Sequence, residues 1–485
     1  MIPDLSLVGG FVAAHVRASF PRRRISLLQN RMLRRLLHHA WDHSPFYRSR
    51  FVAAGISRDD LNTIALNRLP TTDKREVMEH FDTLVTNPVL RLDDLREFDA
   101  DNTDRSATYL GRYHVVHSSG STGKPGYFVY DDAAWKRMLA AITRGALWDR
   151  SLPWVVRFLL KRPRVAFIAA TDGRYGGVLA VGDGIDDLGL AQLQLDINMP
   201  LSQWITNINE FKPTVIIGYP SAIKILLRLA GEGHILIHPE RIVSCGEPLD
   251  PGLRAQIVDA FGCSVVNFYG ASESLALGVE GDPEDGMLLF DDMNLIEVDD
   301  GQMYLTSLTN LTQPLIRYRI SDRLRLIDEG ESGDGDGVSR TAGSSGSVDS
   351  AASVRTRRRF PFTRARVLLS RNEDMLWFND GRGGKEFLHP LAIEGFCVDG
   401  LLDYQFAKTG DESFAMCAER HPDSDENVIR TQVTEQMRRI LHAKHLDHIA
   451  FDVEFVDRIE PDPRTGKKRL VVTCRCEAEA VEKAV

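Results

Sequence analysis

Along the middle of the chain, from residue 111 to about 325, strand-like hydrophobic runs alternate with segments in which hydrophobic residues recur at helical spacing. Strand-like runs are VVH (115–117), VVRFLL (155–160), RVAFIAA (164–170), TVIIGYP (214–220), RIVSCGEPL (241–249) and SVVNFYG (264–270). Helical patterns lie between them, namely DDAAWKRMLAAITRGALW (131–148), SAIKILLRLAG (221–231) and PGLRAQIVDAFG (251–262). This alternation predicts an α/β body in which helices cover a sheet.

The flanking patterns predict further elements around this body. Residues 24–55 carry leucines at helical spacing with arginines between them, which predicts one amphipathic helix docked on the body. In LPTTDKREVMEHF (69–81), Thr72 and Asp73 precede a polar helix and form a capping signal. Residues 305–328 have the pattern of a strand hairpin that exposes Asp322 near a turn.

The last third of the chain predicts a smaller unit. Residues 329–359 are rich in Gly and Ser and poor in apolar residues, so we expect a disordered loop; its basic end RTRRR is interpreted as solvated rather than as a contact for an anionic partner. Residues 364–390 indicate a strand, a charged turn and a hairpin. The remaining residues predict an α+β domain with a helix at 425–445, strands at 449–456 and 469–476, and the turn PDPRTGKK at 461–468.

Composition narrows the class of protein. The 485 residues suffice for two or three domains, and 43% hydrophobic with 26% charged residues is typical of a soluble protein. The formal net charge of −9 argues against nucleic acid or an anionic membrane as a partner. No apolar run approaches the length of a membrane span, and the apolar segment LVGGFVAA lacks the basic flank of a signal peptide.

The cysteines indicate a reducing compartment. Six are present, at positions 245, 263, 397, 417, 474 and 476, too few and too scattered for a disulfide framework. The CxC pair at 474 and 476 has no partner His or Cys at metal-binding spacing. We therefore expect a cytoplasmic protein with reduced thiols.

Candidate chemistry starts at the stretch HSSGSTGKPG (117–126), between a strand end and a helix. Small residues let the backbone approach an anion, hydroxyl and amide groups can donate to phosphate oxygens, and Lys124 adds a positive charge. A nucleoside triphosphate needs all three. Pro125 follows the lysine, so this is not the GxxxxGK[ST] P-loop. Taken alone, the stretch could also be a flexible Ser/Gly turn.

Other polar motifs follow predicted strands. They are Gly218-Tyr219-Pro220-Ser221, Gly246-Glu247-Pro248 and Tyr269-Gly270-Ala271-Ser272-Glu273-Ser274. Because ligands of open α/β sheets sit at the carboxyl ends of strands, these turns are expected to converge on a site. Each residue also has a plain structural interpretation: Glu273 as a cap, Asp322 as a turn residue, and the GKKR run as a solvated hairpin.

The motifs at 117–126, 246–247, 269–273, 317–323, 371–374 and 464–468, in this order, resemble the adenylate-forming superfamily of acyl-CoA synthetases, adenylation domains and luciferases. The chain is most similar to the branch of phenylacetate–CoA ligases and coenzyme F390 synthetases. The resemblance covers nearly the whole chain. It implies a large, multi-subdomain N-terminal α/β domain (1–370), a hinge (371–374) and a small, mobile α+β C-terminal lid domain (375–485).

The resemblance also assigns roles to residues. Ser118, Ser119, Gly120, Ser121, Thr122, Gly123 and Lys124 would cradle the ATP phosphates; Gly246, Glu247 and Tyr269 would wall the adenine; Asp322 and Arg371 would hold the ribose. Glu273 would bind Mg²⁺, a hard cation that prefers oxygen ligands. Residues near Tyr219, Ser221 and Ala271 would line the acid pocket. Lys467 would reach the α-phosphate from the lid, with Lys468 as the competing assignment.

The implied activity is ATP-dependent activation of a carboxylic acid to an acyl-adenylate, with Lys124, Glu273 and Lys467 in catalytic roles. The acyl group would then pass to an acceptor, most simply CoA, in a ligase similar to those acting on aryl or arylacetic acids. An amine, a hydroxyl or a carrier-protein thiol is an alternative acceptor, and a catalytically degenerate nucleotide-binding relative is a further alternative. The oligomeric state is left open, with a homodimer as one option.

Two departures from the family pattern bear on the acceptor. The hinge usually follows Gly-Arg-x-Asp-Asp, but this chain has Ser370 and Arg371 followed by Asn372, Glu373 and Asp374. Glu373 and Asp374 are the hinge positions. The turn FNDGRGGKEFLHP (378–390) is longer than the usual one, which in CoA-forming relatives helps to shape the thioester-forming conformation. Adenylation is therefore the firmer expectation, and the acceptor is the weaker one.

Overall fold

A computed structural model shows how these segments fold. It describes residues 5–101, 107–118, 125–170, 175–327, 360–367, 375–380, 383–389, 393, 396, 398–459 and 470–472. The expected disordered loop at 329–359, the hinge at 371–374 and the turn at 461–468 lie outside the described residues. The domain boundary at 370 therefore stays a prediction.

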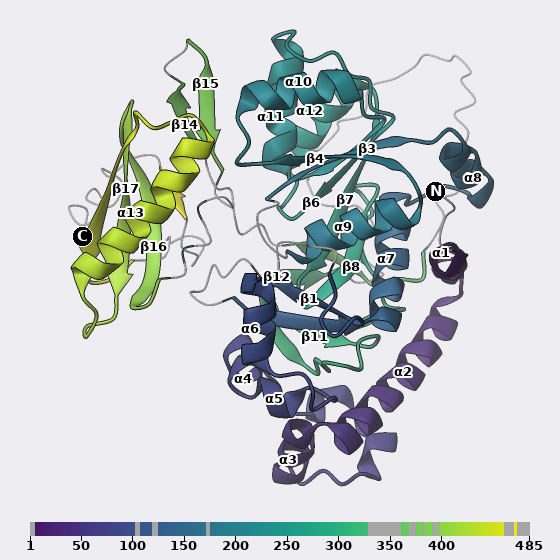
Figure 1. Ribbon diagram of the computed structural model, residues 1–485. Coiled ribbons are helices and arrows are strands. Elements are labelled where there is room, and N and C mark those ends of the chain that lie inside the picture. The colour runs from purple at the N-terminus through teal and green to yellow at the C-terminus, as the bar shows by residue number, and fades with distance from the viewer. Residues whose placement is uncertain are drawn as a thin grey trace, which may run out of the picture.

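The N-terminal segment is helical and wraps one side of the molecule (Figure 1). Its elements are α1 (Leu5–Arg17), α2 (Arg22–His43), α3 (Pro45–Ala53), the short 3₁₀ turns η1 (Asp60–Asn62) and η2 (Leu66–Arg68), α4 (Lys74–Glu79), α5 (Phe81–Leu84) and α6 (Leu92–Asp101). The prediction of one helix over 24–55 was wrong. Helix α2 ends at His43, and Ser44 caps α3 by accepting a hydrogen bond from the Tyr47 N–H at 3.3 Å, with Pro45 as its first residue.

A long mixed sheet forms the body. Its strands are β3 (Arg164–Ala169), β4 (Ala191–Asp196), β5 (Val215–Gly218), β6 (Arg241–Cys245), β7 (Ser264–Ala271), β8 (Ser274–Glu280), β9 (Met287–Leu289), β10 (Asn294–Asp299), β11 (Gln302–Ser307), β12 (Tyr318–Leu326) and β13 (Arg364–Val367). The spatial order is β10-β11-β12-β13-β9-β8-β7-β6-β5-β3-β4. Strands β4, β3, β5, β6 and β7 pair in parallel, and the remaining pairs are antiparallel.

Helices and a hairpin complete the body. The helices are α7 (Asp132–Ala146), α8 (Leu152–Leu160), α9 (Gly176–Asp187), α10 (Leu201–Phe211), α11 (Pro220–Gly231) and α12 (Pro251–Phe261). The antiparallel strands β1 (Tyr113–His117) and β2 (Tyr127–Asp131) flank the glycine-rich stretch. The sequence predicted the strand before the stretch and the helix α7, but not the strand β2 between them. The run VVRFLL, predicted as a strand, is helical instead. Pro153 favours the first turn of α8, and Val155 and Phe158 bury one helical face.

The C-terminal residues form the predicted α+β unit, drawn in green and yellow in Figure 1. A four-stranded sheet has the order β18-β17-β16-β19, built from β16 (Leu401–Gly410), β17 (Ser413–Arg420), β18 (Ala450–Val456) and β19 (Val471–Val472), and α13 (Glu426–Ala443) packs on it. A separate hairpin, β14 (Leu376–Asn379) and β15 (Lys385–Leu388), precedes this sheet. We call these residues, 375–472, the C-terminal module.

The hairpin β14–β15 joins the two parts of the molecule because its side chains alternate between them. Phe387 is buried in the apolar cluster of α10 and α11, where its ring meets Trp204 edge-on at 5.7 Å. The next residue, Leu388, is buried in the core of the C-terminal module. One face of the hairpin is therefore part of the core around α10 and α11, and its other face is part of the core of the C-terminal module.

In the described part of the chain, no helix is both long and apolar enough to cross a bilayer.

A buried ion pair fixes the N-terminal helices to the body. Both carboxylate oxygens of Asp292 accept hydrogen bonds from Arg144 on α7 at 2.9 Å, and Arg17 of α1 adds a third at 2.7 Å. Burial raises the pKa of Asp292, but the two arginines outweigh this effect and hold the pKa below its ordinary value. The carboxylate is thus charged and fully paired.

Asp292→Ala should lower the free energy of unfolding by about 3–5 kcal/mol, because it leaves the buried guanidinium of Arg144 without its carboxylate. Urea denaturation followed by circular dichroism measures this change. The exposed Asp259 on α12 is the matched control, and Asp259→Ala should stay within about 0.5 kcal/mol of the unmodified protein. Equal effects of the two substitutions would contradict the anchoring role of Asp292.

Candidate active site

The predicted motifs converge at the carboxyl ends of three neighbouring parallel strands. Gly218 ends β5 beside Ser244 of β6, and Cys245 ends β6 beside Phe268 of β7. The predicted residues lie at the ends of these strands or directly after them: Tyr219, Ser221, Gly246, Glu247, Ala271 and Glu273. The arrangement is the one expected for a ligand site at the edge of an open sheet.

The first contact of the site links the parallel and antiparallel halves of the sheet. The Tyr269 hydroxyl on β7 donates to Asp322 Oδ2 on β12 at 2.8 Å. Burial, together with the charge of Asp322, raises the pKa of Tyr269 well above its ordinary value, so the phenol stays protonated and donates. Asp322 lies at a bulge inside β12 rather than near a turn, since the β11–β12 register shifts between Met303 and Gln302. Such bulges redirect side chains toward a site.

The second contact holds Glu273, in the tight turn between β7 and β8. The Tyr318 hydroxyl donates to Glu273 Oε1 at 3.1 Å. Burial raises the pKa of Glu273 above its ordinary value, because the partly buried environment disfavours the charged carboxylate. A cation placed against this oxygen would reverse that effect, so the donor chemistry fits a hard ion such as Mg²⁺. Among the described residues, including those around Glu273, no group of three or more Asp, Glu, His or Cys side chains gathers that could hold a metal ion without further ligands.

Hydrogen bonds tie the Glu273 turn to the glycine-rich stretch. Tyr130 donates to the Ser272 carbonyl at 2.6 Å, and the Ser272 hydroxyl donates to the His117 carbonyl at 3.3 Å. At the base of the loop, the Ser118 N–H donates to the Gly126 carbonyl at 2.9 Å, and the Gly126 N–H returns a bond to Ser118 Oγ at 2.9 Å. Ser118 therefore closes the loop. Residues 119–124, with Lys124, lie outside the described residues.

A third group of contacts surrounds Glu247 after β6. Glu247 accepts hydrogen bonds from the Ser221 N–H at 3.0 Å and the Ser221 hydroxyl at 2.9 Å, at the N-terminus of α11. His389 of the C-terminal module lies 3.2 Å from the same carboxylate. Burial raises the pKa of Glu247, but His389 and Ser221 outweigh it and hold the pKa below its ordinary value. Glu247 is thus an ionised carboxylate in this arrangement.

Gly246 is required by the ring of Tyr219. Its φ is +79°, and a Cβ atom there would lie 2.6 Å from Tyr219 Cε1. Only glycine gives both the left-handed conformation and the space for the ring.

Two residues near the site were missed in the sequence. Lys74 begins α4, and its Cε atom lies 3.2 Å from where a Cβ of Gly126 would be. Its charge lowers the pKa of Glu273, although burial of the carboxylate has the larger, opposite effect. The capping signal at Thr72 and Asp73, confirmed by the bond from the Glu76 N–H to Asp73 at 3.0 Å, pointed at this helix but not at its lysine. The other missed residue is His389.

The remaining predicted residues are not placed by the structure. Arg371, Glu373, Asp374, Lys467 and Lys468 lie outside the described residues, and their roles stay predictions.

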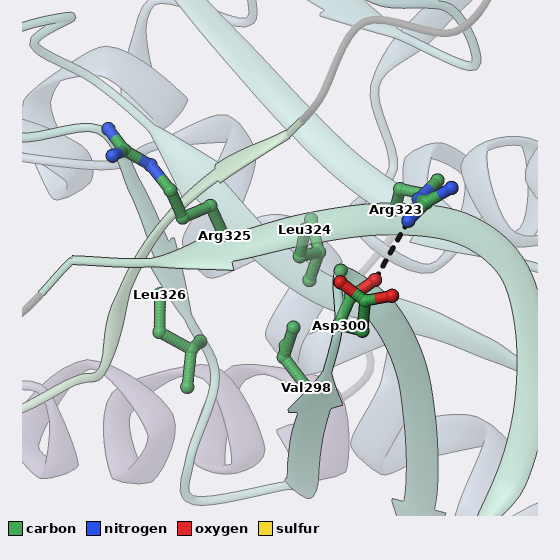
Figure 2. A pocket seen from close by; sticks show the side chains of 7 residues that line it. Val298, Asp300, Arg323, Leu324, Arg325 and Leu326 are labelled. Carbon is green, nitrogen blue, oxygen red and sulfur yellow. Dashed lines mark hydrogen bonds between the residues drawn. The ribbon is translucent and has the colours of Figure 1, made fainter. Parts of the chain in front are cut away.

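A cavity of about 350 Å³ opens elsewhere on β12 (Figure 2). Val298, Asp300, Gly301, Arg323, Leu324, Arg325 and Leu326 line it. Arg323 donates to the Asp300 carbonyl at 2.8 Å, which holds the 299–302 turn against the strand. None of the predicted site residues lines this cavity, so we do not assign it to the site.

Comparison with known proteins gives a family match in the middle of the chain. Residues 190–293 match the family described as AMP-binding enzyme. This range contains the turns after β5, β6 and β7, with every described residue of the site except those on β1–β2, α4, β12 and the C-terminal module.

Relatives and a solved structure agree with this match. The chain is 27% identical to the phenylacetate–coenzyme A ligase of Aromatoleum evansii over 322 residues, which cover 62% of this chain and 66% of that protein. It is 33% identical to the indoleacetate–lysine synthetase of Pseudomonas savastanoi over 141 residues, 28% of this chain and 35% of that protein. The structure of a 2-hydroxyisobutyryl-CoA ligase with 2-HIB-AMP and CoA has a TM-score of 0.57 at 18% identity, covering 96% and 94% of the two chains.

These similarities confirm the resemblance and the fold class inferred from the motifs. The solved structure, at its low identity, supports the fold alone. The match to the Aromatoleum protein leaves about a third of that protein unmatched.

Gly246→Ala should weaken nucleotide binding by about tenfold or more, because the new methyl group would push the Tyr219 ring out of its position and strain the backbone. Equilibrium dialysis with ATP measures this loss. Gly177→Ala on α9 is the matched control, since nothing lies within 4 Å of the added Cβ. Unchanged ATP affinity in a folded Gly246→Ala protein would contradict the importance of this turn.

Proposed function

We propose the following function on the premise that the chain belongs to the adenylate-forming superfamily. It is an ATP-dependent ligase that activates a carboxylic acid as an acyl-adenylate and passes the acyl group to an acceptor thiol, most simply CoA. The observation that carries this proposal is the convergence of Glu273, with its raised pKa, and the Tyr269–Asp322 pair beside the base of the glycine-rich loop.

In the first step a carboxylate oxygen attacks the α-phosphorus of ATP. A new P–O bond forms, the bond to the bridging oxygen breaks, and pyrophosphate leaves with that electron pair. Because two anions must meet, the site has to supply positive charge along the phosphates. We assign Lys124 and the lid residue Lys467, with Lys468 as the competing choice, to this task.

Glu273 is the residue that would hold Mg²⁺, and the ion would neutralise charge on the phosphates. The hydrogen bond from Tyr318 fixes the orientation of the carboxylate in the turn. The raised pKa of Glu273 means that the carboxylate gains from any cation in its vicinity.

The nucleoside would bind along the same edge of the sheet. Asp322, oriented by Tyr269, would accept hydrogen bonds from the ribose hydroxyls, with Arg371 joining it. The Gly246–Glu247 turn and the ring of Tyr269 would wall the adenine. The acid would lie near Tyr219, Ser221 and Ala271, and an aryl or arylacetic acid is our choice of substrate class because the Aromatoleum relative is named for phenylacetate.

A second candidate function has a specific observation in its favour. The Pseudomonas relative is named as an indoleacetate–lysine synthetase, a name that implies an amine acceptor. An amide-forming ligase would use the same adenylate and differ only in the nucleophile; a hydroxyl or a carrier-protein thiol is open in the same way.

Pyrophosphate release from ATP tests the proposal. A panel of aryl, arylacetic and fatty acids is assayed with hydroxylamine as a surrogate acceptor, then with CoA and with lysine. Release that depends on one acid and rises with CoA is the expected result. A rise with lysine but not with CoA would favour the amide-forming function. If no acid in the panel causes pyrophosphate release although the protein still binds ATP, the protein is a catalytically degenerate nucleotide-binding relative.

We further propose that Lys74 contributes positive charge to the phosphate site. Thr72 holds it there, because Thr72 pairs with Tyr318 of β12 as an added bridge, and Tyr318 in turn donates to Glu273. A lysine from α4 thus lies beside the loop base at Gly126, and its charge lowers the pKa of Glu273.

Lys74→Met should reduce kcat/KM for ATP by about 10- to 100-fold, since it removes a charge that faces the phosphates but keeps the length of the side chain. Steady-state kinetics at saturating acid measures the effect. Arg75→Met is the matched control, because the neighbouring side chain is 84% exposed and should matter little. Equal kinetics for the two variants would remove Lys74 from the site.

A further inference from the structure

His389 of the C-terminal module is buried against the candidate site. It follows β15 directly, and its side chain has no exposed surface. Its Nε2 atom lies 2.5 Å from Ser221 Oγ and 3.2 Å from Glu247 Oε1, and its ring centroid is 5.6 Å from that of Tyr219. A residue from beyond the predicted hinge therefore contacts both the presumed acid pocket and the adenine wall.

The three side chains do not form a hydrolytic triad. In such a triad the serine donates to one histidine nitrogen, and the carboxylate binds the other nitrogen. Here the Ser221 hydroxyl donates to Glu247 Oε1, and that same oxygen lies close to Nε2 of His389. The cluster is instead a carboxylate that collects donors from both parts of the molecule.

A second contact seats the same hairpin. Glu386 Oε2 accepts a hydrogen bond from the Leu201 N–H at 2.7 Å, at the N-terminus of α10. Lys444 donates to the Met199 carbonyl at 3.1 Å and to Glu386 at 3.3 Å. Because the carboxylate sits at a helix N-terminus, the contact is favourable for its charge. These hydrogen bonds fix the position of the hairpin against α10, and in this position His389 contacts Glu247.

The hairpin and the last residues of β18 lie at opposite ends of the module's sheet. The hairpin residue Asn379 accepts a bond from His448, just before β18 begins at Ala450. The segment that carries Lys467 starts after β18 ends at Val456. Seven residues of strand separate these ends by about 20 Å. A module seated through its hairpin must therefore turn before it can present the opposite end.

We propose that His389 is a positioning residue for acyl transfer, which ties the seated C-terminal module to the Ser221–Glu247 pair. This inference rests on the proposed function. When the module is seated, Glu247 has donors from Ser221 and His389; when the module turns to present Lys467 for adenylation, Glu247 keeps Ser221 and is free on its other side to face the nucleotide. His389 thereby links the position of the C-terminal module to the hydrogen bonding of Glu247.

The test separates the two half-reactions, with the acid found active in the panel. His389→Ala should slow transfer of the acyl group from the preformed adenylate by about 10- to 100-fold, the effect of losing one hydrogen bond to a charged group. Acid-dependent ATP–pyrophosphate exchange should stay within about threefold of the unmodified enzyme. His389→Gln, which keeps a donor, should recover a large part of the transfer rate.

His442→Ala is the matched control, since His442 lies in the same module and pairs only locally with Asp447 at 2.8 Å among the contacts that we describe. Its two half-reactions should be unchanged. Equal losses of exchange and transfer in His389→Ala, or full transfer activity, would overturn the proposal.

Hydrogen exchange provides a readout that does not need a substrate. In His389→Ala, the peptides that cover 383–389 and the start of α11 should exchange faster than in the unmodified protein, while His442→Ala leaves them unchanged. If no acid in the panel yields pyrophosphate, the proposed function fails and this measurement alone decides the seating role. Unaltered exchange in both peptides would then overturn it.

Discussion

The site depends on one electrostatic constraint: its carboxylates are partly buried, and its proposed ligand is itself an anion. A buried carboxylate is costly unless donors or cations surround it. Asp322 receives the Tyr269 hydroxyl, Glu273 receives that of Tyr318, and Glu247 receives two bonds from Ser221. Neutral hydroxyl and backbone N–H groups hold these acids in place without lysine or arginine side chains, so such charges stay free for the phosphates.

Under the proposed function, the cations come from segments outside the sheet. Lys74 belongs to α4, Lys124 to the glycine-rich loop, and Lys467 to the C-terminal module. In this proposal the sheet fixes the acids and the contacts to the nucleoside, while the positive charge that promotes reaction between two anions would come from its surroundings.

The sequence predicted the parts of this design that local pattern governs. Strands followed by polar turns gave the edge with Tyr219, Glu247 and Glu273, and the capping signal gave the start of α4. Local pattern failed where competing signals met. Val155 and Phe158 fit a strand as well as a buried helix face, and the break at Ser44 lies inside a leucine periodicity that continues across it.

Contacts between segments that are distant in the chain could not be predicted from the sequence. The bulge that redirects Asp322 depends on the register between β11 and β12, and the approach of Lys74 to Gly126 depends on the bridge from Thr72 to Tyr318. His389 directly follows the hairpin β14–β15, and the sequence pattern of this hairpin reveals only that the hairpin is half-buried. The packing of the hairpin against α10 and α11, which lie far earlier in the chain, decides which core receives each face.

The seated hairpin also bears on the unusual hinge and the long turn at 378–390. A hairpin that donates Phe387 to one core and Leu388 to the other is held by packing as well as by hydrogen bonds. Turning the module then requires withdrawing an aromatic side chain from the N-terminal part and leaving Glu386 without the Leu201 N–H. That cost has to be met by what the turned module gains, which under our proposal is the contact of a lysine with the phosphates. Nucleotide charge, rather than the acid, is therefore the ligand property best suited to move the module.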